Sequence, residues 1–188
     1  HLPSDTDRAY VVVQHTGPEH KTLLGSLLQK VTALPVQDAH NGMVVAANTI
    51  YVMPTSGTLT VVRGCLHFIA TPQAASAPFV IDAFLTSLAQ DQGCRAVGVV
   101  LSGMGRDGVL GLQAIHNGGG LTLAQEPDTA AFASMPQSAI DAQCVDLVAP
   151  PQDMPAHIVQ CLQAPKSKAA STQPPSDAPP VDALPAIV

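Results

Sequence analysis

The sequence of 188 residues is poor in basic side chains, and this scarcity excludes some classes of protein. Only 8 Lys and Arg stand against 14 Asp and Glu, so the formal net charge is −6. Proteins that bind nucleic acid need clustered Lys and Arg for phosphate contacts, and we therefore expect no nucleic-acid partner. The chain also lacks an apolar run long enough to cross a bilayer, which predicts no membrane insertion.

Cysteine is scarce as well, and its spacing favours reduced thiols. The four cysteines lie far apart and form no CxxC pair: Cys65, Cys94, Cys144 and Cys161. An even number is compatible with disulfides, but a domain of this size without a signal peptide favours free thiols and a cytoplasmic location. The seven histidines include no pair at the spacing of metal ligands, so we expect no metal site.

The two ends of the chain differ from its middle. The chain begins at His1 without an initiator Met, and residues 165–188 hold six of the seventeen prolines. A segment so rich in Pro, Ser, Ala and Asp cannot bury a core. We therefore expect one domain over residues 1–164 and a Pro-rich linker or tail over residues 165–188, both within a larger protein.

The most informative stretch runs from Val97 to Gly108, VGVVLSGMGRDG. Its apolar half predicts a buried parallel strand, and its glycines predict a tight turn before a helix. In open α/β sheets functional groups lie at the carboxyl ends of strands, where Asp107 falls. The backbone N–H groups of Gly103, Met104 and Gly105 face the same edge and are candidate oxyanion donors.

A similar strand–turn–helix unit opens the chain. Residues 10–13 form a predicted strand, His15 lies at its carboxyl end, and residues 16–19 match a helix capping box. His15 and Asp107 are therefore expected on the same edge of one sheet, where an imidazole base can pair with a carboxylate. Each has a plainer alternative, His15 as a structural hydrogen-bond donor and Asp107 as the N-cap of the following helix.

The rest of the chain alternates strands and helices. Three short β-rich runs lie close enough in sequence to predict hairpins: 49–53, 59–62 and 66–69. Further helices and strands are expected at 79–91, 121–125, from Pro136, at 145–148 and at 151–162. Repeated strand–helix units with right-handed crossovers predict an α/β fold, a doubly wound and mostly parallel sheet with a β-hairpin insertion.

Residues 103–108 also match the GxGxxG fingerprint of dinucleotide-binding proteins, with Glu126 or Asp128 as the acidic residue further along the chain. However, a carboxylate inside the loop would repel a pyrophosphate, and this loop follows a late strand rather than the first. We therefore expect no nucleotide and no other cofactor.

Four short motifs occur in a distinctive order: VVQH at 12–15, LSGMGRDG at 101–108, AQ at 124–125 and MPQSAI at 135–140. Together they resemble the catalytic domain of CheB, the chemotaxis receptor methylesterase family. The resemblance implies hydrolysis of γ-glutamyl methyl esters, and deamidation of glutamine, on methyl-accepting chemoreceptors by a Ser-His-Asp triad. It is strongest to the subgroup that is fused to a receptor methyltransferase, which we then expect after residue 188.

The resemblance also assigns roles to individual residues. It implies that His15 is the general base, that Asp107 orients it, and that the Met104 N–H is an oxyanion donor near Gly103 and Gly105. It further implies that Met135 and Pro136 line the site.

One element of the family pattern is missing from this sequence. The family's nucleophilic serine lies in a glycine-rich loop after the first strand, and no such loop occurs in the fourteen residues before His15. The expected domain therefore lacks its first strand and serine loop. The alternative function is a catalytically inactive regulatory or receptor-docking module of a larger signalling protein.

Overall fold

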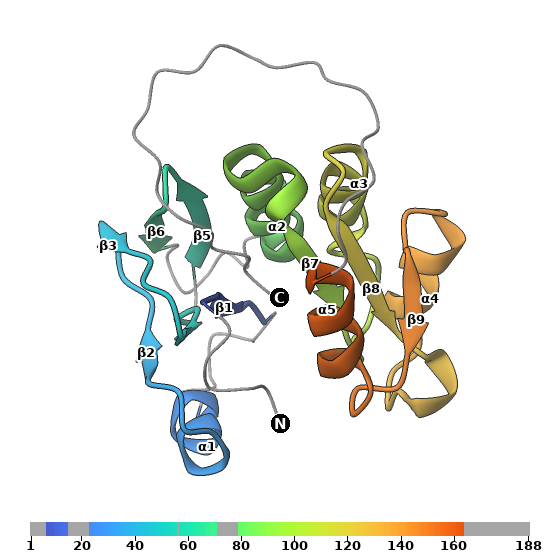
Figure 1. Cartoon of the computed structure of the whole chain (residues 1–188), viewed down its shortest axis with the longest axis horizontal. Helices are drawn as coiled ribbons and strands as arrows, with labels where there is room; N and C mark the ends of the chain where they lie inside the picture. The colour runs from blue at the N-terminus through green and yellow to red at the C-terminus, as the bar shows by residue number, and fades with distance from the viewer. Residues whose placement is uncertain (1–6, 15–22, 56, 71–78, 164–188) are drawn as a thin grey trace.

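A computed structural model of the chain describes residues 7–14, 23–55, 57–70 and 79–163 (Figure 1). Within these ranges the elements follow one another in this order: β1 (Ala9–Val12), α1 (Leu24–Val31), β2 (Val36–Asp38), β3 (Met43–Val44), β4 (Thr49–Val52), β5 (Gly57–Val62), β6 (Cys65–Ala70), α2 (Val80–Gln92), the 3₁₀ helix η1 (Gly93–Arg95), β7 (Val97–Val100), α3 (Val109–Asn117), β8 (Leu121–Gln125), the 3₁₀ helix η2 (Pro127–Thr129), α4 (Ser134–Asp141), β9 (Leu147–Ala149) and α5 (Met154–Gln163).

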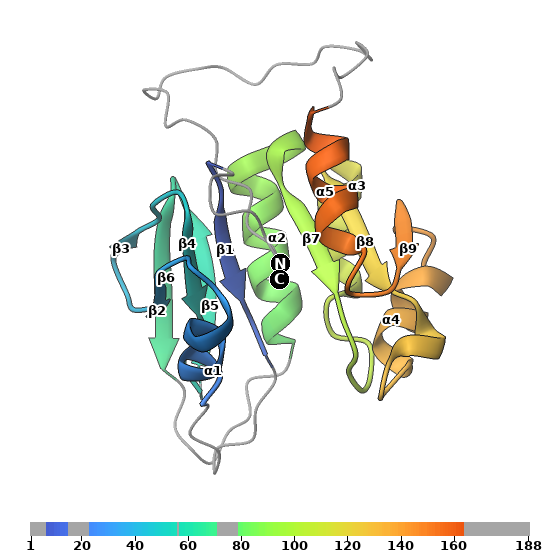
Figure 2. The same cartoon turned by 60° about the horizontal axis from the view of Figure 1, so that its bottom comes forward.

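Two parallel three-stranded sheets form the frame of the fold. The first has the strand order β1-β4-β2 and the second the order β7-β8-β9. β5 and β6 form an antiparallel hairpin, which β3 extends. In Figure 2, β1 and β7 are the inner strands of the two parallel sheets, and α2 is seen between them in this view. The expected α/β fold, with a mostly parallel frame and a hairpin insertion, is confirmed.

Helices cover both faces of the strands because the strands are apolar on both faces. All four residues of β7 are buried. α2, α3 and α4 contribute to the largest core cluster, whereas α5 packs Met154 and Ile158 against a separate cluster that contains Val97 and Val99. α1 packs onto the other face of the first sheet. This two-sided covering is typical of a doubly wound sheet and leaves the strand ends accessible.

The prediction of a hairpin for residues 49–53 is wrong. β4 lies between β1 and β2 and pairs in parallel with both, and all four of its residues are buried. An uninterrupted buried run is typical of a central parallel strand, and this burial outweighs the short spacing along the chain. The hairpin prediction is confirmed for β5 and β6, whose two-residue turn places Arg63 and Gly64 at φ 51° and 67°.

The closest packing between helices lies at Gly111 of α3. A Cβ atom added there would lie 2.3 Å from the Cβ of Leu85 in α2, a distance that no real pair of side chains adopts. Gly25 of α1 is a different case, because an added Cβ would lie 3.6 Å from the nearest atom, an oxygen of the Asp38 side chain. The lack of a side chain is therefore required at one helical glycine and not at the other.

We expect Gly111→Ala to lower the free energy of unfolding by about 1–3 kcal/mol, because α2 and α3 must move apart. The matched change Gly25→Ala should raise it by up to about 1 kcal/mol, since alanine favours the helix and finds room. Urea unfolding of both variants checks the pair. Equal effects of the two changes would contradict the close packing at Gly111.

Candidate functional site

A pocket of about 470 Å³ lies where β1 and β7 end. It opens between the two parallel sheets, at the carboxyl ends of both strands, which is where the sequence predicts the functional groups. Its walls come from the end of β1, the end of β7 with the loop that follows, and one residue each from α2 and α4: Val12, Val13, Gln14, Val99, Val100, Leu101, Ser102, Gly103, Met104, Ile81 and Met135.

Gln14 is the last described residue before His15, and it lines this pocket. Its Nε2 atom is buried and has no hydrogen-bond acceptor among the described residues. A buried polar group without a partner costs about 1–3 kcal/mol, so this donor is available to a water molecule or to a further group at the pocket. His15 itself and the expected capping box at 16–19 lie outside the described residues.

Asp107 is buried beside this pocket and caps a helix other than the expected one. Its carboxylate oxygens accept hydrogen bonds from the backbone N–H of Ile81, at 3.0 Å, and of Asp82, at 2.9 Å. These donors lie in the first turn of α2. The alternative in which Asp107 is the N-cap of α3 is wrong, because Gly108 is the N-cap residue and α3 has no side-chain hydrogen bond from that position. The reason is spatial, since the N-terminus of α2 lies against the loop.

The loop between β7 and α3 is tied to residues 132–138 by a series of hydrogen bonds. Gly103 donates its N–H to the carbonyl of Phe132 at 3.0 Å and accepts from the N–H of Met135 at 3.0 Å. The Gly105 N–H donates to the hydroxyl of Ser134 at 3.1 Å. The Gly105 carbonyl accepts from the hydroxyl of Ser138 at 3.3 Å. These bonds fix the loop and engage the N–H groups of Gly103 and Gly105.

Of the three predicted oxyanion donors, two are therefore already engaged. The N–H groups of Gly103 and Gly105 point to acceptors within the protein, as described above. Met104 lies between them, and its N–H makes no hydrogen bond to another described residue. Because both its neighbours are held, the peptide of Met104 is fixed in place at the wall of the pocket.

The two predicted lining residues behave differently. Met135 lines the pocket and packs so closely on Gly103 that a Cβ at that glycine would lie 2.7 Å from its terminal methyl carbon. Pro136 is buried in the first turn of α4 but is not among the residues that line the pocket. α4 begins at Ser134, before the Pro136 start that the sequence predicts.

Gln125, at the end of β8, holds the loop between β7 and α3 through hydrogen bonds of its side chain. Its Oε1 accepts from the N–H of Ser102 at 2.8 Å, and its Nε2 donates to the carbonyl of Thr129 at 3.0 Å. The residue is buried. Sequence reasoning noted Gln125 only as part of a family motif, although a polar residue that closes an apolar strand is a signal for such a role.

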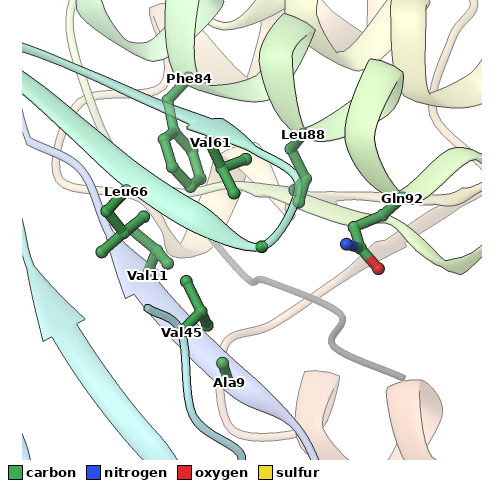
Figure 3. A pocket seen from close by; sticks show the side chains of 9 residues that line it. Ala9, Val11, Val45, Val61, Leu66, Phe84, Leu88 and Gln92 are labelled. Atoms are coloured by element: carbon green, nitrogen blue, oxygen red, sulfur yellow. The ribbon is translucent and has the colours of Figure 1, made fainter. Parts of the chain in front are cut away.

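The small cavity, His116 and the cysteines do not form a second site in the described part of the chain. The cavity in Figure 3 is lined mainly by apolar side chains of β1, the hairpin and α2, together with Val45 and the polar Gln92, and its volume of about 10 Å³ holds at most one water molecule. His116 Nδ1 lies 3.1 Å from Asp146 Oδ1, away from the loop. Among the described residues, no three His, Cys, Asp or Glu side chains gather as metal ligands, and the four cysteines are free thiols. No helix described here has the length and apolar character to span a membrane.

Comparison with known proteins places this α/β domain in one family. The sequence profile of the family described as CheB methylesterase matches residues 1–158. The crystal structure of the Thermotoga maritima CheB methylesterase catalytic domain superposes with a TM-score of 0.74 at 27% identity, over 85% of this chain and 87% of that chain. The chain belongs to the CheB methylesterase family.

Curated relatives are longer than this chain. A protein-glutamate methylesterase/protein-glutamine glutaminase of Pyrococcus horikoshii is 32% identical over 166 residues, which are 86% of this chain and 45% of the relative. An uncharacterised 104.1 kDa protein of Rhodobacter capsulatus is 40% identical over 123 residues, 65% of this chain and 13% of the relative. The chain thus spans less than half the length of these relatives.

Asp107→Ala should lower the free energy of unfolding by about 1–2 kcal/mol, because the first turn of α2 loses both of its side-chain acceptors. Asp128→Ala, at an exposed position of η2, is the control and should change it by less than about 0.5 kcal/mol. Denaturant unfolding compares the two. Equal stability of both variants would show that the cap on α2 contributes nothing.

A second prediction concerns Asp82, whose carboxylate accepts from the N–H of Gly111 at 2.9 Å. Burial, and to a lesser extent the charge of Asp107, raise the pKa of Asp82 above its ordinary value of 3.8. The folded state thus keeps this proton to a higher pH than the unfolded state. The contribution of Asp82 to the free energy of unfolding therefore rises as the pH falls through its folded pKa towards 3.8, and is unchanged below that.

Asp82→Asn removes this contribution, so the stability of the parent relative to the variant should increase as the pH falls over that range. Unfolding of both proteins at a series of pH values between neutral and about 4 measures the difference. A difference that stays constant, or that shrinks towards acid, would contradict the raised pKa.

Proposed function

We propose that this chain supplies the base and the orienting acid of a methylesterase that hydrolyses γ-glutamyl methyl esters on chemoreceptors. The observation that carries the proposal is the shared pocket: Gln14, which directly precedes His15, and the loop that leads to Asp107 both line it. The family match supports the same reaction, and the Pyrococcus horikoshii relative bears the name protein-glutamate methylesterase/protein-glutamine glutaminase.

In the proposed reaction His15 takes the proton of a serine hydroxyl while the serine oxygen attacks the ester carbonyl carbon. Asp107 orients the imidazole and stabilises its charged form. The Met104 N–H donates to the oxyanion that forms on the carbonyl oxygen, a contribution typically worth about a hundredfold or more in rate. His15 then returns the proton to the departing methoxide, which leaves as methanol. Water hydrolyses the acyl-serine to glutamate by the same route, and a glutamine side chain would release ammonia instead.

The nucleophile of this reaction lies outside the chain in our proposal. Ser102 is at the pocket, but its hydroxyl accepts the N–H of Phe132 at 3.0 Å as part of the loop framework. Each of β1 and β7 has one paired and one unpaired edge among the described strands. A further parallel strand between them would use both free edges, and the loop after it would bring a serine into the pocket. The unpartnered Nε2 of Gln14 supports a site that is completed in this way.

The wider setting is also part of the proposal. The chain matches a small part of a 104.1 kDa relative, which supports a place within a longer signalling protein. We propose that residues 165–188 link this domain to a receptor methyltransferase and that the protein acts in the cytoplasm. The coding sequence on either side of the chain tests the first of these points.

The function is tested by methanol release from methylated chemoreceptors. We expect the full-length protein to release methanol and His15→Ala to reduce kcat by about 10²- to 10⁴-fold, the usual range for loss of a general base. His67→Ala, an exposed histidine on β6, is the matched control and should retain the full rate. Full activity in His15→Ala would contradict the assignment of the base. No release by any of the three proteins would favour a regulatory or receptor-docking module.

A further inference from the structure

The two helices that flank the loop of Asp107 both lack a side-chain cap of their own. The N-cap residue of α2 is Phe79, at φ 59°, and the N-cap residue of α3 is Gly108, at φ 97°. Neither residue caps its helix with a side-chain hydrogen bond. The first backbone N–H groups of a helix have no partner within the helix, so a buried helix start needs acceptors from elsewhere.

Each of these helices receives its acceptor from the other. Asp107, directly before α3, accepts from the N–H groups of Ile81 and Asp82 in the first turn of α2. Asp82, in that first turn of α2, accepts from the N–H of Gly111 in the first turn of α3 at 2.9 Å. Both carboxylates are buried, at 8% and 7% exposure. Each of the two helix N-termini is thus capped by a carboxylate that comes from the start of the other helix, and this exchange of caps joins α2 to α3.

This exchange bears on Asp107 because two sets of donors compete for it. Asp107 immediately precedes Gly108, the N-cap position of α3, so the first turn of α3 is the nearest set of unpaired N–H groups along the chain. Asp82 occupies that turn, and the carboxylate of Asp107 is directed to Ile81 instead, a residue that lines the pocket. Without Asp82, the N–H of Gly111 at the start of α3 would lose this acceptor.

We propose that Asp82 is a positioning residue: by capping α3 it keeps the carboxylate of Asp107 on α2, next to Ile81 at the wall of the pocket. The proposal rests on the proposed function, in which Asp107 orients His15. It differs from that function in assigning a role to a residue that touches neither substrate nor the reacting atoms.

The surroundings of Asp82 are consistent with this role. Its backbone partners at the start of α3 stabilise the ionised form, whereas burial and the charge of Asp107 oppose it and raise its pKa. The two carboxylates therefore lie close enough to interact, yet each is held by N–H donors at a helix N-terminus, where negative charge is favoured.

Two substitutions at Asp82 separate the capping role from a loss of folding. In the full-length protein, Asp82→Ala should lower kcat for methanol release by about tenfold or more with KM within about twofold, because a misplacement of about 1 Å of a catalytic group can cost about a hundredfold in rate. Asp82→Asn keeps an acceptor for the N–H of Gly111 and should stay within about threefold of the parent. Asp91 is the matched control, because it sits at the other end of α2 and accepts from the N–H groups of Arg63 and Gly64 in the hairpin turn. Asp91→Ala should affect stability and leave kcat unchanged.

The decisive readout is the proton titration of His15, followed by NMR. If Asp82→Ala releases Asp107 from the imidazole, the pKa of His15 should fall in that variant and remain at the parent value in Asp91→Ala. Unchanged kcat and an unchanged titration in Asp82→Ala would overturn the proposal, and so would an equal loss of activity in Asp82→Asn.

A third readout does not depend on activity. Amide hydrogen exchange at Ile81 should accelerate in Asp82→Ala, because Asp107 leaves α2 for the start of α3, and should be unchanged in Asp91→Ala. If the parent releases no methanol, the proposed function fails, while this exchange measurement still decides whether Asp82 holds Asp107 in place. Unaltered protection of Ile81 in Asp82→Ala would contradict that role.

Discussion

The backbone pairing of parallel strands is the constraint from which the site follows. A strand presents N–H and C=O groups along both edges, and each buried group needs a partner. In the described part of the chain, β1 pairs only with β4 and β7 only with β8, so the two inner edges face the space between the sheets. The pocket lies at the ends of these strands, and residues at the ends of both β1 and β7 line it.

Helix packing keeps the two sheets in a fixed relation around this space. α2 packs against β5 of the hairpin, next to the first sheet, and against α3, which packs against β7 and β8 of the second sheet. α2 and α3 approach each other closely at Gly111, which has no side chain. The carboxylates of Asp82 and Asp107 join the two helices at their N-termini, next to the loop between β7 and α3. The loop itself is held from its other side by residues 132–138 and by Gln125. The site thus depends on contacts between elements distant in sequence.

The sequence predicts what depends on local pattern and misses what depends on contacts between distant elements. Uninterrupted apolar runs and glycine-rich turns locate most strands and helices, and the edge that holds Asp107 follows from them. The parallel pairing of β4 was missed because spacing along the chain does not show which strands become neighbours in space. For the same reason the sequence did not predict that Asp107 caps α2. It also did not predict that Gly103 and Gly105 donate their N–H groups to residues 132–134. No local signal marks such partners.

The central claim is that a further strand completes the site between β1 and β7. Hydrogen–deuterium exchange of the full-length protein tests it at the backbone amides of β1 and β7 that face each other. If a strand pairs with both edges, these amides exchange as slowly as those of β4 and β8, which lie inside their sheets. If they exchange as fast as amides that have no hydrogen-bond partner, the edges are open in the whole protein, and the proposed source of the nucleophile is wrong.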